Sequence, residues 1–330
     1  AHGALDREPR PMTFPRYLMF AAMCVAPLAA ACTTRSTEES AVSRGDQAFA
    51  LGNYEEALAE YRLAVRQGAD DPRTTVRVAH TYAIMGRVDD ASAYYVESAS
   101  KEDGLADQAV ADLMRLARES LANGDRFAMA TAVETSLRLR PGLGVGEMSL
   151  PLARHYFGNG EYGRALPFYQ NAMAGATDSP PEIVFEVGLA YEEIRDCRHA
   201  LIYFERFREM VRPWERAEVD WYIGTCAFNV ARELRGRSVL EEDEGETLQR
   251  ALILIDRTVE VGEPRNIQAQ AWFEKGDILA EMGECELAMD AYSQVRYADQ
   301  AGSLVQRAQR AFDQIRFGRG LEYLRDGRCR

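Results

Sequence analysis

The sequence predicts an all-α fold, a solenoid of about seven helix-turn-helix repeats that ends in a C-terminal capping helix. A Gly, aromatic, Ala, aromatic, Ala pattern recurs along the chain, with spacings of 34 residues from Ala57 to Ala91 and 35 from Ala165 to Ala200. An amphipathic stretch with helical spacing of its apolar residues precedes the copies. The 330 residues are 47 % hydrophobic and include only 12 prolines, which is typical of a folded, core-forming chain.

The N-terminal region is expected to be a targeting segment. Residues 1–11 are polar and without pattern, and Met12 looks like a natural start, so we expect these eleven residues to be a start-site artefact or a tag. After Arg16, residues 17–31 carry no charge. This run has the length of a signal-peptide core and is shorter than the roughly 20 residues that span a membrane.

Leu-Ala-Ala-Ala directly precedes Cys32, and this ending resembles the lipobox of bacterial lipoproteins. The resemblance implies a signal peptide over residues 12–31, a lipid on the Cys32 thiol and a flexible tether over 32–43. Ala29 departs from it, because the family most often has Leu there. Thr33 replaces the Asp that favours inner-membrane retention in that family, which implies an outer-membrane lipoprotein facing the periplasm. The alternatives are an ordinary secretory signal, with Cys32 as a plain thiol, or retention in the cytoplasm.

The repeat pattern has a physical basis in helix packing. A turn Gly permits the backbone conformation that ends a helix, and a small Ala lets neighbouring helices approach closely. In the first copy the pattern consists of Gly52, Tyr54, Ala57, Tyr61 and Ala64. A helix pair of about 34 residues with this signature resembles the tetratricopeptide repeat. The resemblance implies a right-handed superhelical solenoid over residues 44–300.

The sixth copy and the C-terminus depart from the repeat. An insert of about 15 residues separates the helices of the sixth copy, at about 236–247. Its acidic run, 241–246, predicts a solvated loop between longer helices. Calcium binding is the alternative, although the EF-hand ligand spacing is missing. Residues 301–330 are expected to form capping helices, over 303–316 and 320–327.

Four cysteines remain after the predicted processing: Cys197, Cys226, Cys285 and Cys329. An even number in an oxidising compartment is compatible with two disulfides. On the repeat frame, Cys197 and Cys226 lie near the same edge of consecutive helices, which predicts a bond between them. A Cys285–Cys329 bond follows for the remaining two. The alternative is that these are buried free thiols that pack as small hydrophobic residues.

The sequence offers little material for catalysis. It lacks a Gly-rich phosphate loop, a GxSxG motif and an HExxH motif, and its cysteines lack zinc-site spacing. The 39 basic and 52 acidic residues give a net charge of −13, which argues against nucleic-acid binding. We therefore expect no enzymatic activity, cofactor, metal site or nucleic-acid partner. An envelope enzyme with its site in the sixth-copy insert is the remaining alternative.

In the tetratricopeptide family, the first helix of each unit lines a concave face that binds protein or peptide partners. Carried over to this chain, the resemblance implies a groove lined by Arg73, Arg77, His80, Arg115, Arg118, Arg154, Phe157, Trp221 and Phe228. The arginines resemble the carboxylate clamps of some members, although the clamp Asn residues are missing here. They predict capture of an acidic peptide or a C-terminal carboxylate. Alternatively, the arginines pair with neighbouring carboxylates and the aromatic residues belong to the core.

Together these observations predict a non-enzymatic protein–protein interaction scaffold that is lipid-anchored in the bacterial envelope. A second hypothesis is a transient assembly chaperone, or a pilotin-like factor, for an outer-membrane or secretion component. Both share the fold and differ in how long the partner stays bound.

Overall fold

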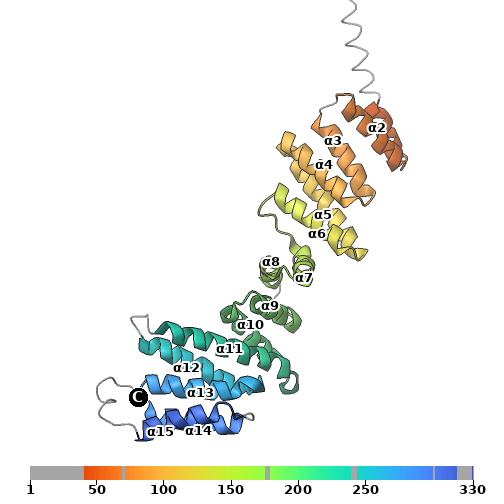
Figure 1. Cartoon of the computed structure of the whole chain (residues 1–330). Coiled ribbons are helices and arrows are strands. Elements are labelled where there is room, and N and C mark those ends of the chain that lie inside the picture. The colour runs from red at the N-terminus through yellow and green to blue at the C-terminus, as the bar shows by residue number, and fades with distance from the viewer. Residues whose placement is uncertain are drawn as a thin grey trace, which may run out of the picture. The chain divides into compact units, whose positions relative to one another are not determined.

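The computed structural model describes residues 41–68, 71–174, 179–238, 244–299 and 302–317, together with Cys329. Within these ranges all regular secondary structure is helical, which confirms the all-α fold class (Figure 1). None of the helices there is both long and apolar enough to cross a membrane. The predicted signal peptide, Cys32 and most of the tether lie outside the described residues.

The chain divides into two compact units, residues 1–145 and 146–330. In the first unit, each predicted repeat is a pair of consecutive helices joined by a tight turn (Figure 1). The pairs are residues 41–50 with α2 (Tyr54–Arg66), α3 (Pro72–Ile84) with α4 (Val88–Lys101), and α5 (Ala106–Ala122) with α6 (Arg126–Leu139).

The second unit continues the same arrangement and ends in a single described helix. Its pairs are α7 (Ser149–Gly158) with α8 (Tyr162–Ala174), α9 (Pro181–Glu193) with α10 (Cys197–Met210), α11 (Ala217–Ser238) with α12 (Glu244–Val261), and α13 (Arg265–Glu281) with α14 (Cys285–Ala298), followed by α15 (Val305–Phe317). The helix predicted over 303–316 is thus confirmed as α15. The helix predicted over 320–327 lies outside the described residues.

The turns inside the pairs use left-handed backbone, as the Gly pattern predicts. Five turn glycines have φ between +73° and +84°, namely Gly52, Gly86, Gly124, Gly160 and Gly283. A side chain at such a φ is strained, so Gly is favoured there. The turn between α9 and α10 is different, because it places Arg195 in this conformation, with φ of 64°.

Close approach of paired helices explains two further glycines within the repeats. A Cβ atom built on Gly188 of α9 would lie 2.6 Å from the ring of Phe204 on α10. A Cβ on Gly276 of α13 would likewise lie 2.6 Å from the ring of Tyr292 on α14. Phe204 and Tyr292 are both buried. The missing side chain therefore lets an aromatic ring fill the space between the helices.

The sixth-copy insert lengthens its two helices. Residues 236–238 belong to α11, which has 22 residues, and 244–247 belong to α12, which has 18. The longer helices that the sequence predicts on either side of the insert are therefore present, and residues 239–243, where the loop is predicted, lie outside the described residues. No group of carboxylate, Cys or His side chains in the described ranges is arranged to hold a metal ion.

The extension of α11 carries Arg235 to three carboxylates on α13. Arg235 Nη2 lies 2.8 Å from Glu281 and 3.1 Å from Asp277, and Nη1 lies 2.5 Å from Glu274. Burial of the guanidinium opposes its charge, but the three carboxylates outweigh this effect and raise the pKa of Arg235. This cluster ties the sixth helix pair to the seventh.

Candidate partner-binding surface

The predicted groove residues of the first unit lie on α3 and α5, and several are held by carboxylates of neighbouring pairs. Arg77 on α3 donates a 3.0 Å hydrogen bond to Asp46, which belongs to the preceding pair. Tyr61 on α2 donates a 2.7 Å hydrogen bond to the same Asp46 oxygen. Arg77 therefore links two repeats.

His80 is engaged in the same way with the following pair. Its Nδ1 atom lies 2.9 Å from Asp112 on α5, and the Tyr95 hydroxyl donates a 2.7 Å hydrogen bond to that Asp112 oxygen. Burial disfavours the charged form of Asp112, but the hydrogen bonds from His80 and Tyr95 outweigh burial and lower the pKa of Asp112.

The other predicted cations of this unit are less uniform. Arg115 donates a 2.8 Å hydrogen bond to Glu119, one turn further along α5. Arg118 is exposed. The Arg73 guanidinium is also exposed and forms no ion pair with the described residues. The first unit thus brings Arg77, His80 and Asp112 into inter-repeat contacts.

In the second unit, Arg154 and Phe157 on α7 take part in packing. Arg154 donates two 3.0 Å hydrogen bonds to Glu186 on α9, and Tyr169 on α8 donates a 2.8 Å hydrogen bond to the same carboxylate. Phe157 is half-buried and packs edge-on against Tyr169, with 6.2 Å between ring centroids. Arg154 therefore joins two successive helix pairs, whereas Phe157 packs within its own pair, α7 with α8.

The two predicted groove aromatics on α11 differ. Trp221 is 44 % exposed and remains available on the surface. Phe228 is 5 % exposed and belongs to the core between α11, α12 and α13, so its assignment to the groove is wrong. Burial of its apolar side chain in that core stabilises the fold. For Arg77 and Arg154, the structure favours the alternative that they pair with neighbouring carboxylates.

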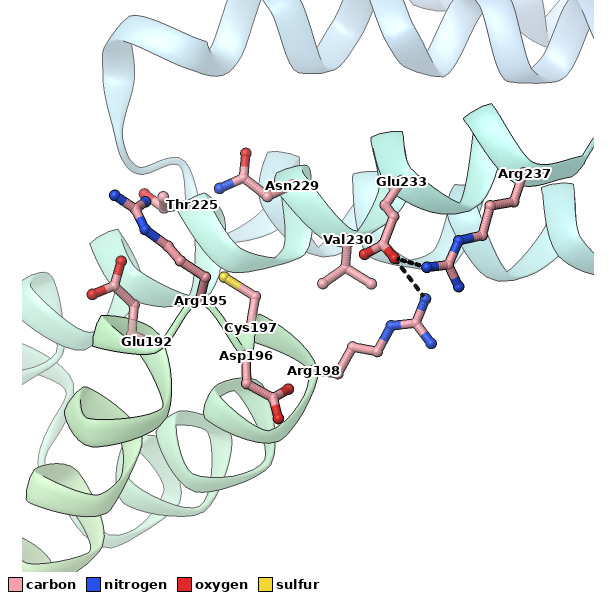
Figure 2. A pocket seen from close by; sticks show the side chains of 10 residues that line it. All are labelled: Glu192, Arg195, Asp196, Cys197, Arg198, Thr225, Asn229, Val230, Glu233 and Arg237. Carbon is pink, nitrogen blue, oxygen red and sulfur yellow. Dashed lines mark hydrogen bonds and ion pairs between the residues drawn. The ribbon is translucent and has the colours of Figure 1, made fainter. Parts of the chain in front are cut away.

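A polar pocket of about 560 Å³ lies between the α9–α10 turn and α11. Figure 2 shows Arg195 and Glu192 on the α9 side, facing Thr225 and Asn229 on α11. Arg198 and Arg237 both contact the Glu233 carboxylate on the other side of the pocket (Figure 2). We call this the Arg195 pocket; its full lining is Glu192, Arg195, Asp196, Cys197, Arg198, Thr225, Asn229, Val230, Glu233 and Arg237.

Two groups of the Arg195 pocket have open hydrogen-bonding capacity. The Arg195 guanidinium and the Asn229 amide are exposed, and neither side chain forms a hydrogen bond within the described part of the chain. Asp196 differs, because it accepts hydrogen bonds from the backbone N–H of His199 and pairs with its ring at 2.7 Å. Arg195 and Asn229 can therefore engage a ligand without breaking an existing contact of their own.

The cysteines are placed as the sequence predicts. The structure pairs Cys197 with Cys226, with 4.9 Å between Cα atoms, and Cys285 with Cys329, with 5.5 Å between Cα atoms. Both separations suit a disulfide. The first pair joins α10 to α11, and Cys197 also lines the Arg195 pocket (Figure 2).

Arg195 and Asn229 were not predicted from the sequence as site residues. A signal for Arg195 was present: Gly283 stands two residues before Cys285, and the equivalent position before Cys197 is Arg195. Where an otherwise regular repeat lacks its turn Gly, the residue present is kept despite backbone strain, which indicates another requirement at that position. Asn229 carries no such signal, because its role depends on the turn that faces it.

No protein-family model and no curated protein matches the sequence. Several solved structures align with it. MamA is 19 % identical, over 52 % of this chain and 91 % of that chain, with a TM-score of 0.31. The tetratricopeptide protein TTC0263 from Thermus thermophilus is 21 % identical, over 52 % of this chain and 90 % of that chain, with a TM-score of 0.24. YrrB, a tetratricopeptide protein described as having an unusual peptide-binding site, is 15 % identical, over 66 % of this chain and 97 % of that chain, with a TM-score of 0.32.

Proposed function

We propose that the chain is a non-enzymatic protein–protein interaction scaffold that holds a partner protein or peptide, with the Arg195 pocket as part of its binding surface. The observation that carries this proposal is Arg195 itself. It occupies a left-handed turn position, φ 64°, at which five sister turns have Gly. Its side chain faces a pocket and has no hydrogen-bond partner in the described ranges.

The left-handed backbone of Arg195 is strained, and no local contact of its side chain with the described residues compensates for that strain. A non-Gly residue in the left-handed region costs about 1 kcal/mol or more. No ion pair within the described residues offsets that cost. A side chain kept under such strain at a pocket is expected to serve binding rather than folding.

The pocket suits a polar stretch of polypeptide. The Arg195 guanidinium supplies N–H donors, the Asn229 amide supplies both a donor and an acceptor, and the Glu192 carboxylate supplies acceptors. A peptide main chain presents N–H and C=O groups that match this set. Trp221, which is 44 % exposed and lies one turn of α11 before Thr225, adds apolar contact area beside the pocket.

Crosslinking the full chain in its native membranes tests the function. We expect one protein to be enriched with wild-type chain and its recovery to fall at least about tenfold with Arg195→Gly, which is the loss typical of a binding hot spot. Arg206→Ala is the matched control, because Arg206 is exposed and is not among the residues that line the Arg195 pocket. Equal recovery with both variants would remove the Arg195 pocket from the binding surface. No enriched protein would contradict the scaffold.

The cellular setting is part of the proposal. The resemblance of the segment before Cys32 to a lipobox supports a lipid-anchored protein of the bacterial envelope that faces the periplasm from the outer membrane. The proximity of the two cysteine pairs suits an oxidising compartment. Cys32→Ala should release the chain into the soluble fraction, as measured by membrane fractionation. Unchanged membrane association would contradict lipidation at Cys32.

A further inference from the structure

A second pocket lies between α14 and α15 and shares no residue with the Arg195 pocket. It has a volume of about 320 Å³, and we call it the α14–α15 pocket; it is lined by Tyr292, Ser293, Arg296, Val305, Ala308, Gln309, Phe312 and Arg316. Tyr292 and Ala308 are buried, with 5 % and 2 % exposure, and Val305 and Phe312 are half-buried. The pocket therefore has an apolar floor.

Two arginines lie at the rim of this pocket, and none of the described residues that line it has a carboxylate. The Arg296 guanidinium lies 4.6 Å from the ring centroid of Tyr297 and donates a hydrogen bond to the Tyr297 hydroxyl, and the Arg316 guanidinium lies 5.4 Å from the ring centroid of Phe317. Neither arginine forms an ion pair with the described residues. Contact with a ring restrains each guanidinium, and its remaining N–H groups can bind a carboxylate.

This arrangement contrasts with other arginines between the helix pairs. Arg77, Arg154 and Arg235 are each paired with carboxylates of an adjacent pair. The whole chain has a net charge of −13. In so acidic a protein, two rim arginines without a carboxylate partner among the described residues favour a ligand that supplies the negative charge.

We propose that the α14–α15 pocket binds an acidic segment of a partner protein. One bulky apolar side chain of that segment packs on Ala308 and Phe312, and carboxylates on either side of it bind Arg296 and Arg316. This inference rests on the proposed scaffold function and names the chemistry of one partner segment. A concave pocket with a buried floor suits a single inserted side chain, which favours a peptide over the flat surface of a lipid bilayer.

The test is a selection of random dodecapeptides, displayed on phage, against the full-length chain. We expect enriched peptides to carry Asp and Glu around one apolar residue. Synthetic copies should lose at least about tenfold in affinity, by fluorescence anisotropy, when Arg296→Glu and Arg316→Glu are combined. The matched control combines Arg250→Glu with Arg310→Glu, which changes the net charge equally at exposed positions outside the pocket. The control should stay within about twofold of wild type, and circular dichroism should show equal helicity for all three proteins.

Three results would overturn the proposal. Peptides that bind both double variants equally would place the peptide site elsewhere and leave the scaffold function standing. The absence of any enriched peptide would contradict both the pocket and the scaffold. Binding of phosphatidylglycerol vesicles that is lost only with the Arg296 and Arg316 changes, with no acidic peptide selected, would assign the pocket to a membrane surface.

Discussion

Arg154 on α7 and Glu186 on α9 are joined by two hydrogen bonds of 3.0 Å, and Tyr169 on α8 donates to the same carboxylate. This contact connects two successive helix pairs. It engages Arg154, which the repeat resemblance places in the partner groove. Asp46 likewise accepts hydrogen bonds from Arg77 and Tyr61. Several groove cations are therefore structural links between repeats.

The structural role of Arg154 predicts a loss of stability without a loss of binding. Arg154→Met removes a half-exposed pair and leaves Glu186 with its Tyr169 hydrogen bond. We expect the free energy of unfolding to fall by about 1 kcal/mol, since partly exposed pairs contribute little. Urea denaturation measures this change, and the crosslinking yield of the partner should stay at the wild-type level. A strong loss of partner with unchanged stability would restore Arg154 to the binding surface.

Asp112 predicts a pH dependence of stability. Its pKa is lowered in the folded state, so its contribution is fully present above the unfolded pKa of about 3.9 and is lost as pH falls through the folded pKa. Asp112→Asn should lower the free energy of unfolding by about 1–2 kcal/mol at pH 7, and the difference from wild type should shrink below about pH 4. Urea denaturation at several pH values measures both effects. Asp290→Asn, at an exposed position on α14, is the control, and a deficit for Asp112→Asn that persists unchanged at pH 2 would contradict the assignment.

The close packing at Gly188 predicts that Gly188→Ala lowers stability, although Ala has the higher helix propensity. Gly188→Ala places a methyl group 2.6 Å from the Phe204 ring, so we expect a loss of about 1–3 kcal/mol by overpacking. Gly163→Ala on α8 is the matched control, because nothing lies within 4 Å of its Cβ position. That change should leave stability unchanged or raise it by up to about 1 kcal/mol. Thermal unfolding separates the two, and a neutral Gly188→Ala would show that the α9–α10 contact can relax.

The two cysteine pairs predict sensitivity to reduction. Each closes a loop, of sequence separation 29 for Cys197–Cys226 and 44 for Cys285–Cys329. By the loop-entropy relation each oxidised bond contributes roughly 3–4 kcal/mol. The free energy of unfolding should therefore fall on reduction, and Cys197→Ser combined with Cys226→Ser should remove part of that response. Mass spectrometry that finds four free thiols in protein isolated from its native envelope would support buried thiols instead.

Much of the fold follows from the sequence, because each repeat is a local unit. The spacing of Gly52, Ala57 and Tyr61 defines a turn and the second helix of a pair within a few residues. Contacts between consecutive helices then need no long-range pairing, which is why the cysteine placement of Cys197 and Cys226 could also be predicted. The insert follows the same logic, because its described residues lengthen α11 and α12, as the sequence predicts.

The candidate site could be predicted only in part. A groove position inferred from the repeat does not reveal whether a carboxylate of an adjacent pair, such as Asp46 or Glu186, reaches the cation. Phe228 shows the same limit for aromatic residues, because α12 and α13 cover it. Arg195 could have been found from the missing turn Gly, whereas its pocket depends on how α11 packs against that turn.

The most direct test of the scaffold is a paired measurement on Arg195→Gly. Relief of the left-handed strain is offset by the greater freedom of Gly in the unfolded chain, so the free energy of unfolding should stay unchanged or rise by up to about 1 kcal/mol. The affinity for the crosslinked partner should fall at least about tenfold in the same protein. Unchanged affinity together with raised stability would contradict the central claim, because Arg195 would then be a strained turn residue with no role in binding.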